Sequence, residues 1–446
     1  MAPSATSSKF EFSSWNATRF FVPLCIQAMS QGLTYPLVGT IVAHGPGEAA
    51  EYSAFAQGLM IMFLLGCVGY GLVTTGMVFA KDRVGYIRFS RVTIAIMLGE
   101  AALQILLALP GISTLVFGHL LGLDGYQLEV ARWSMFWSLP AQMGFFMRNI
   151  PQVILYNEHE TSIANAATIM RIVVTAVVAP LFRWAGLVGW QWGTVCFTVP
   201  VLLESAVMWL FARSYVRGLP RKLAGVGKVT AMKVFLFSIP LSLGGFMLML
   251  AVFALNAIIN RTENGVSMLA IHLVAIGLIN PLSYGALRNQ AVAIGFPPAY
   301  DGDSRTFRFA VCSGLALSLP LLIMLIPALS GWYFCHIQNL LPSQEPLARN
   351  ALWVAMLFPV LQAMRGHAEG LAAYRRRPKA VLMGQAVFFA VLTATLLFLF
   401  LLRMPGYLMG ITALCCASAA TLAAIRISLS KRFSGMADMP VQHLTH

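Results

Sequence analysis

The chain contains a long series of separate apolar runs, and each run is about as long as a helix must be to cross a lipid bilayer, roughly 20 residues. Hydrophobic residues make up 58% of the 446 residues, whereas charged residues make up only 10%. An ordinary soluble domain is about a quarter charged, because it needs a polar surface. A membrane is therefore the expected solvent, and the sequence predicts an all-α polytopic membrane protein.

The apolar runs predict twelve transmembrane helices. Prolines such as Pro140 and Pro359 fall inside several of these runs, and neighbouring helices can satisfy the backbone groups that a proline leaves unpaired. We expect the spans at residues 20–42, 54–80, 92–112, 131–156, 162–184, 190–212, 234–259, 267–294, 309–329, 350–374, 380–402 and 406–426.

Lysine and arginine are distributed very unevenly between the alternate sides of these spans. The N-terminus, the even-numbered connections and the C-terminal tail, together with the span ends that adjoin them, hold 21 of the 30 basic residues, and the opposite connections with their adjoining span ends hold five. Because positively charged loops stay in the cytoplasm, we expect both termini to be cytoplasmic. The predicted location is a multi-pass position in a membrane, most simply the bacterial inner (plasma) membrane.

Two similar halves are predicted from weak internal matches. Gly69-Tyr70-Gly71 matches Ser283-Tyr284-Gly285, and Leu139-Pro140 matches Phe358-Pro359 at a similar distance. Six spans per half give a parallel repeat, a plan that transporters use to place a substrate site between the halves. The predicted organisation is a cytoplasmic tail at 1–19, an N-lobe at 20–212, a basic linker at 213–233, a C-lobe at 234–426 and a cytoplasmic tail at 427–446.

Three stretches carry a resemblance to a known superfamily. They are Phe20-Phe21-Val22-Pro23-Leu24 at the start of span one, Gly76 to Arg83 after span two, and the pattern from Leu139-Pro140 to Tyr156. With the long link after span six, they resemble the multidrug/oligosaccharidyl-lipid/polysaccharide exporter superfamily, which includes the multidrug-and-toxin-extrusion (MATE) transporters. Within it the chain is most similar to the progressive ankylosis protein group.

The resemblance implies a MATE-like fold and the export of small organic anions, with citrate, nucleotides and pyrophosphate considered for the group. Multidrug exporters of the superfamily typically keep an aspartate in span one. Residues 20–42 contain no acidic residue, which argues against cation-coupled drug export.

Ionisable residues inside predicted spans are candidate functional residues, because burying them in a bilayer is costly. The arginines are Arg148, Arg171, Arg288 and Arg365. Arginine binds carboxylate or phosphate through two parallel hydrogen bonds and stays charged. Such arginines can also snorkel to the interface or pair with nearby acids, as Arg365 can with Glu369 four residues on. Four arginines exceed three acids, which favours an anion-attracting vestibule.

Polar stripes on otherwise apolar helices extend the predicted substrate site. Asn280, Tyr284 and Arg288 recur every four residues in span eight, which is typical of one helix face. Interhelical hydrogen bonding is the alternative interpretation. The predicted substrate-binding residues are Arg148, Arg288, Arg365, Tyr284, Asn280, Gln152, Gln31 and His367.

Three acidic residues, Glu100, Glu204 and Glu369, are candidate coupling residues. A buried carboxyl group can exchange a proton near neutral pH, and an interhelical ion pair with Arg171 or another arginine is the alternative. The seven cysteines lack metal-ligand spacing, so no metal and no other cofactor is expected.

No catalytic motif is present, so we expect a transporter and not an enzyme. The predicted function is secondary active export of small organic or phosphorylated anions by alternating access between two lobes. The alternatives are a flippase for a lipid-linked or polyprenyl-phosphate substrate, a multidrug exporter, or an intramembrane enzyme. The expected partners are an anionic small molecule and the lipid bilayer, without nucleic acid, and the protein is expected to be a monomer.

Overall fold

The computed structural model describes residues 11–30, 34–69, 71–222, 229–259, 261–296, 304–338 and 340–430. Every regular element in these ranges is helical. The elements are α1 (Ser14–Ser30), α2 (Thr34–Val42), α3 (Glu48–Gly66), η2 (Cys67–Gly69), α4 (Leu72–Phe79), α5 (Arg83–Leu107), α6 (Pro110–Ser113), η3 (Thr114–Leu120), α7 (Gly125–Trp137), α8 (Leu139–Asn157), α9 (Thr161–Trp184), α10 (Trp190–Gly218), α11 (Ala231–Ile259), α12 (Gly265–Leu287), α13 (Asn289–Gly295), α14 (Ser304–Ile323), α15 (Pro327–Gly331), η4 (Trp332–Ile337), α16 (Glu345–Ala355), α17 (Leu357–Tyr374), α18 (Pro378–Leu401) and α19 (Gly406–Ser430).

The predicted all-α membrane fold is confirmed. Ten helical segments of the described chain are long and apolar enough to cross a membrane. Of the two remaining predicted spans, the fourth is divided into α7 and α8, and the described part of the first comprises α1 and α2 on either side of residues 31–33. The fourth is interrupted at Ser138, next to Pro140 in the first turn of α8, where proline cannot donate a helical hydrogen bond.

Two predicted span boundaries are wrong at their charged ends. Spans three and nine were expected at 92–112 and 309–329, whereas α5 begins at Arg83 and α14 begins at Ser304. The start of α5 is fixed by Asp82, whose carboxylate accepts a hydrogen bond from the Gly85 backbone nitrogen at 2.7 Å. An N-cap of this kind satisfies backbone donors that a new helix leaves unpaired, so polar turns beyond the apolar run are helical too.

The chain folds into two compact units. The N-unit comprises Ser30–Ser242, and the C-unit comprises Met1–Met29 together with Leu243–His446. In the C-unit, Phe20 of α1 lies edge-on against Phe296 at 5.6 Å between ring centroids. In the N-unit, Phe237 in the first half of α11 packs against Phe79 at 5.1 Å. The finer division at 20–212, 213–233 and 234–426 stays a prediction.

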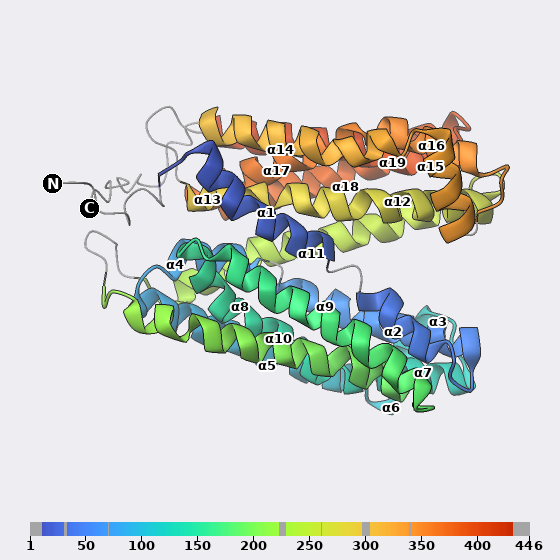
Figure 1. Ribbon diagram of the computed structural model, residues 1–446, viewed down its shortest axis with the longest axis horizontal. Coiled ribbons are helices and arrows are strands. Elements are labelled where there is room, and N and C mark those ends of the chain that lie inside the picture. The colour runs from blue at the N-terminus through green and yellow to red at the C-terminus, as the bar shows by residue number, and fades with distance from the viewer. Residues whose placement is uncertain are drawn as a thin grey trace. The chain divides into compact units, whose positions relative to one another are not determined.

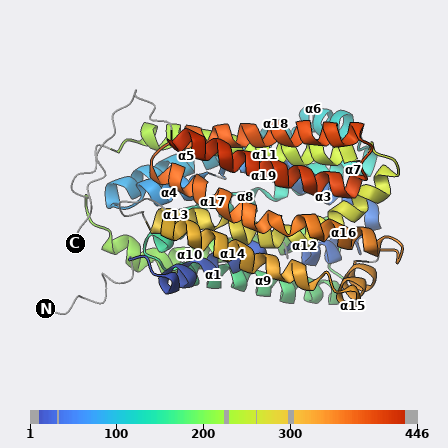
Figure 2. The same ribbon diagram turned by 90° about the horizontal axis from the view of Figure 1, so that it is seen from above.

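The two units repeat the same order of elements at a constant distance along the chain. Helices α3 and α12, α4 and α13, and α9 and α18 each begin 217 residues apart. Each unit also has a short helix that starts with proline and leads into a π-helix, α6 with η3 and α15 with η4. Figures 1 and 2 show α13 and α15 at opposite ends of the C-unit bundle, as α4 and α6 are in the N-unit. The predicted pseudo-symmetric pair of six-helix halves is thereby confirmed.

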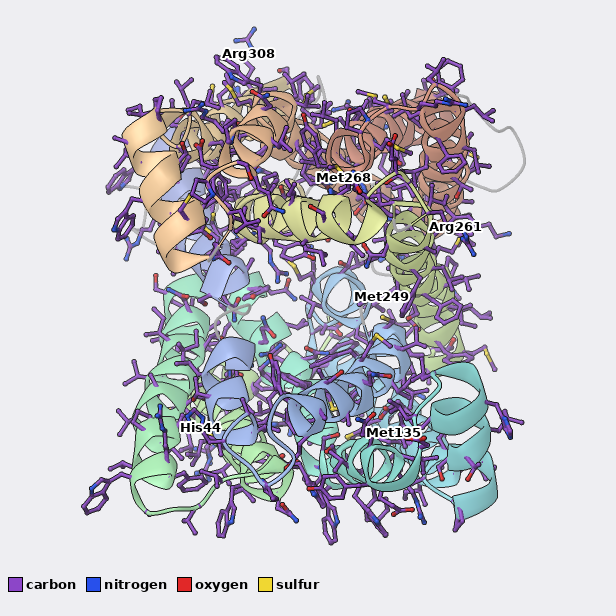
Figure 3. All side chains as sticks on the ribbon, turned by 90° about the vertical axis from the view of Figure 1, so that its right-hand side faces the viewer. His44, Met135, Met249, Arg261, Met268 and Arg308 are labelled. Carbon is purple, nitrogen blue, oxygen red and sulfur yellow. The ribbon has the colours of Figure 1, made fainter. Side chains whose placement is uncertain are left out.

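One helix of each unit lies at the centre of its packing. In the N-unit, α8 contacts α4, α5, α9 and α10, and in the C-unit α17 contacts α12, α13, α14, α18 and α19. Outer helix faces carry exposed apolar side chains, including Leu319 and Leu236, as expected where lipid is the solvent. Arg308, near the start of α14, extends away from the C-unit helices (Figure 3). The central helices α8 and α17 carry the polar residues described next.

Candidate functional site

A buried charged cluster joins three helices of the N-unit. The Arg148 guanidinium on α8 donates a 3.0 Å hydrogen bond to the Glu204 carboxylate on α10. Arg171 on α9 forms an ion pair with the same Glu204 oxygen at 3.4 Å, and the Thr168 hydroxyl donates to the other oxygen at 2.5 Å. Glu204 is completely buried. Two guanidinium groups therefore share one carboxylate, and the cluster has one positive charge in excess.

An aromatic ring and a proline fix the position of Arg148. The Phe145 ring lies 5.2 Å from the Arg148 guanidinium carbon and 5.9 Å from that of Arg171, within range of cation–π attraction. Pro151 cannot donate to the Met147 carbonyl oxygen, and the Trp209 indole donates to it instead at 3.2 Å. Nε of Arg148 is buried without a hydrogen-bond partner. Arg148 is thus held rigidly and keeps one donor to spare.

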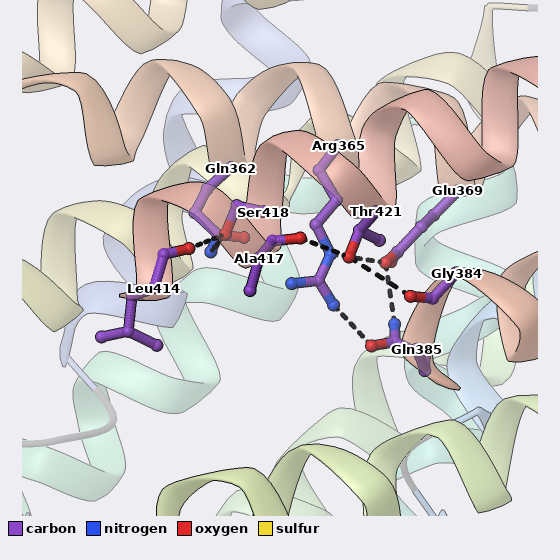
Figure 4. A network of polar contacts seen from close by, with 9 residues as sticks. All are labelled: Gln362, Arg365, Glu369, Gly384, Gln385, Leu414, Ala417, Ser418 and Thr421. Carbon is purple, nitrogen blue, oxygen red and sulfur yellow. Dashed lines mark hydrogen bonds and ion pairs between the residues drawn. The ribbon is translucent and has the colours of Figure 1, made fainter. Parts of the chain in front are cut away.

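The C-unit contains a closed polar network around Arg365 (Figure 4). Arg365 on α17 donates to Glu369 at 2.9 Å and to the Gln385 side-chain oxygen at 2.6 Å, and the Gln385 amide nitrogen donates to Glu369 at 2.8 Å. Arg365 also lies over the Phe388 ring at 4.8 Å. Arg365 and Glu369 are buried and paired one to one, so this network is neutral.

The two clusters occupy corresponding places in the internal repeat. Five pairs of residues in the two clusters are each separated by 217 positions in the sequence. They are Arg148 and Arg365, Gln152 and Glu369, Thr168 and Gln385, Arg171 and Phe388, and Glu204 and Thr421. In the N-unit the carboxylate that pairs with the arginine is Glu204, which lies on α10, the last helix of its half of the repeat. In the C-unit it is Glu369, which lies on α17 four residues after Arg365. The N-unit has a second arginine where the C-unit has Phe388. The repeat thus keeps one arginine in both units and adds positive charge in only one.

Arg288 and the polar stripe of span eight lie on α12 and its end. Arg288 is half-buried at the junction of α12 and α13, and within the described chain it forms no ion pair. Tyr284 has 55% of its surface exposed, and Asn280 is half-buried. The three residues recur at helical spacing, and their role in binding substrate stays a prediction.

The other predicted substrate residues make local contacts. His367 is completely buried, its Nε2 lies 2.8 Å from the Thr306 hydroxyl, and its Nδ1 lies 3.2 Å from a guanidinium nitrogen of Arg426. Gln152 donates to the Tyr156 hydroxyl, while its own side-chain oxygen is buried without a partner. Gln31, like Tyr70 of the predicted repeat match, lies outside the described residues.

Glu100 is the one predicted coupling residue that no described arginine contacts. It is buried on α5, and neither carboxylate oxygen has a hydrogen bond of ordinary geometry. The Gln142 side chain on α8 is the polar group that interacts with it. Glu204 and Glu369, in contrast, each hold an arginine.

Sequence reasoning missed several members of the two clusters. Thr168, Gln385 and Phe388 were not predicted, whereas Arg171 was named as the alternative ion-pair partner of the candidate acids and pairs with Glu204. The repeat distance that relates Arg148 to Arg365 also relates Thr168 to Gln385, and this periodicity was the available signal. The described residues hold no group of three or more His, Cys, Asp or Glu side chains suited to a metal ion.

No protein-family profile matches the chain, and no curated protein matches it in sequence. Solved structures of transporters share its fold. A MOP superfamily transporter from Pyrococcus furiosus superposes with a TM-score of 0.73 at 16% identity, covering 96% of this chain and 99% of that one. It is described as having a binding pocket of reverse polarity that suggests a different function.

Two further structures give the same result. An outward-facing multidrug resistance MATE family transporter has a TM-score of 0.72 at 16% identity, with 96% and 99% of the two chains covered. A eukaryotic MATE transporter has a TM-score of 0.67 at 15% identity, with 95% of each chain covered. The chain therefore has the fold of MATE transporters of the MOP superfamily. The narrower resemblance to the progressive ankylosis group stays a prediction.

Proposed function

We propose that this protein is a secondary active transporter that exports small organic or phosphorylated anions. The observation that supports this function is a local excess of positive charge in the N-unit cluster, where two buried arginines face one buried glutamate. Arg148 and Arg171 both pair with Glu204, and the half-buried Arg288 has no carboxylate partner among the described residues. A net positive charge is costly inside a membrane, and an anionic ligand would compensate it.

Arg148 is the residue that we propose to contact the anion first. It is the least buried member of the N-unit cluster, with 9% of its surface exposed, and it keeps an unused Nε donor. Arg288, with Asn280 and Tyr284 on the same helix, is proposed as a second contact. Arg365 is fully engaged by Glu369 and Gln385, so we propose that it supports the site through the packing of α17.

The fold and the polarity of the cluster together favour anion transport over drug export. The structural neighbours include multidrug transporters, but predicted span one lacks an acidic residue. The Pyrococcus furiosus neighbour is described as having a binding pocket of reverse polarity that suggests a different function, which is a precedent for a change of pocket polarity on this fold. We propose a monomer with both termini in the cytoplasm, powered by an ion gradient or the membrane potential.

The experiment is a flux assay with the purified full-length protein in proteoliposomes. Labelled fumarate, citrate, pyrophosphate and a nucleotide are compared with a lipophilic cation typical of multidrug export and with a fluorescent polyprenyl-phosphate-linked sugar. We expect flux of at least one soluble anion well above that of empty liposomes, and none of the cation. Flux of the cation alone, or movement of the lipid alone, would contradict the proposal.

A further inference from the structure

Glu204 contacts the N-unit arginines in the way that a bound anion would. One of its oxygens accepts from Arg148 at 3.0 Å and lies 3.4 Å from Nε of Arg171, while the other accepts from Thr168. These three contacts come from α8 and α9, and both guanidinium groups lie against the Phe145 ring. The Phe145 ring therefore contacts both arginines in addition to the carboxylate that they hold.

We infer that Glu204 occupies the anion site of the N-unit in the empty transporter, and that a substrate dianion takes its place on Arg148 and Arg171 as Glu204 takes up one proton. This inference rests on the proposed function and adds to it the charge of the substrate and the coupling ion. Arg148, with its exposed edge and spare Nε donor, makes the first contact.

The charge of the substrate follows from the composition of the cluster. Once Glu204 is protonated, two positive charges remain, one each on Arg148 and Arg171. A dianion brings the net charge of the cluster to zero, whereas a monoanion leaves a net positive charge in a buried site, which is unfavourable. Dicarboxylates and phosphorylated compounds with two charges fit this requirement. Planar guanidinium groups also bind both chemical classes through paired hydrogen bonds.

The proton follows from the burial of Glu204. The side chain is completely inaccessible to solvent, so a carboxylate there that lost both arginines would be a buried charge without a cationic partner, whereas the neutral acid avoids that cost. The proton is taken from water as the anion binds and returns to water as the anion leaves. Each transported dianion is therefore accompanied by one proton, and the net movement is one negative charge.

Among the described residues, the helices that pack against α10 supply no ion-pair partner of Glu204 other than these two arginines. Helices α8 and α9 supply Arg148 and Arg171, and α2 has no charged residue. Glu51 of α3 binds the backbone nitrogen of Trp190 at the start of α10, about 21 Å along the helix from Glu204. On α7, Arg132 is paired with Glu129. The two arginines are thus the charged groups that determine the ionisation of Glu204.

The C-unit supplies a matched control. Thr421 stands at the position that corresponds to Glu204, and Phe388 at that of Arg171. Its carboxylate, Glu369, faces a single arginine and is also held by Gln385. Displacement of Glu369 would leave one positive charge instead of two, so the C-unit network is not expected to exchange its carboxylate for a dianion.

The test compares Glu204→Gln with Glu369→Gln in proteoliposomes at pH values from 6 to 8.5. The probe is labelled fumarate, which is fully ionised throughout this range, with pyrophosphate and citrate as further probes, all below saturation. Uptake of one proton per anion predicts that wild-type flux falls up to tenfold per pH unit on the alkaline side. We expect Glu204→Gln to lose this slope and to exceed wild type at pH 8.5, and Glu369→Gln to keep it.

A wild-type slope in Glu204→Gln would overturn the inference while the proposed function stands. If wild type moves none of these three anions and no nucleotide either, the proposed function itself fails. If Glu204→Gln does not fold, proton uptake is measured on wild type by titrating the probe that it transports in buffers of different ionisation enthalpy. After correction for the titration of the probe itself, one proton per bound anion supports the exchange, and zero protons overturn it.

Discussion

At the scale of single residues, the central feature is that corresponding positions of the internal repeat differ in net charge: the N-unit cluster is positive and the C-unit network is neutral. Arg148 shares its carboxylate with Arg171, whereas Arg365 has Glu369 and Gln385 to itself. We therefore expect Arg148 to bind the ligand in the N-unit, and the corresponding Arg365 to stabilise the fold of the C-unit. This difference can be measured separately in each unit.

Replacing Arg148 should reduce anion transport in a graded way. A hydrogen bond to a charged group contributes about 1.5–3 kcal/mol, so Arg148→Ala should lower the initial efflux rate about ten- to a hundredfold. Arg148→Lys keeps the charge without the planar fork and should restore only part of the rate. Arg308→Ala, at an exposed arginine, is the control at equal membrane abundance. Full activity of Arg148→Lys would indicate that only charge matters at this position.

Replacing one partner of the Arg365–Glu369 pair should destabilise the fold. Removal of one member of a buried ion pair costs about 3–5 kcal/mol, because a buried charge loses its partner. Glu369→Met should therefore lower the thermal unfolding midpoint in detergent, and Arg365→Met/Glu369→Met should recover much of the loss. Equal midpoints for the single and double variants would show that the pair is not coupled.

At the scale of elements, most spans were predictable from the sequence, because apolar length alone identifies them. Their charged ends were not, since α5 and α14 both begin in polar turns before the apolar run, and in α5 this turn is capped by Asp82. The clusters were only partly predictable. Periodicity placed Arg148 and Arg365 inside spans, but the choice of partner depends on how helices pack: Arg171 contacts Glu204 on α10 and not Glu100 on α5. No pattern within a single helix carries that information.

The close packing of α17 gives a prediction about glycine. A Cβ atom at Gly370 would collide with the backbone oxygen of Gln290 on α13, whereas one at Gly277 on α12 would meet no atom within 4 Å. Overpacking typically costs about 1–3 kcal/mol, so Gly370→Ala should lower the unfolding midpoint. Gly277→Ala should leave it unchanged or raise it slightly, because alanine favours helix. A lower midpoint for Gly277→Ala alone would contradict the packing described here.

At the scale of the whole molecule, the uneven distribution of basic residues predicts the orientation in the membrane. Single cysteines introduced in a cysteine-free background at Arg217 and Arg376 should react with a membrane-impermeant maleimide only from the cytoplasmic side. Cysteines at Glu263 and Leu341 should react only from the opposite side. All four positions are exposed, so reagent access is not limited by packing. Labelling of all four from one side would contradict the twelve-span topology.

The central claim is that buried arginines select an anionic substrate. The most direct measurement is the initial efflux rate of the anion that wild type transports fastest, compared in matched proteoliposomes with Arg148→Ala/Arg288→Ala. The loss of hydrogen bonds from two guanidinium groups predicts a fall of at least about a hundredfold, at unchanged membrane abundance and unfolding midpoint. Anion efflux of the double variant equal to that of wild type would contradict the claim.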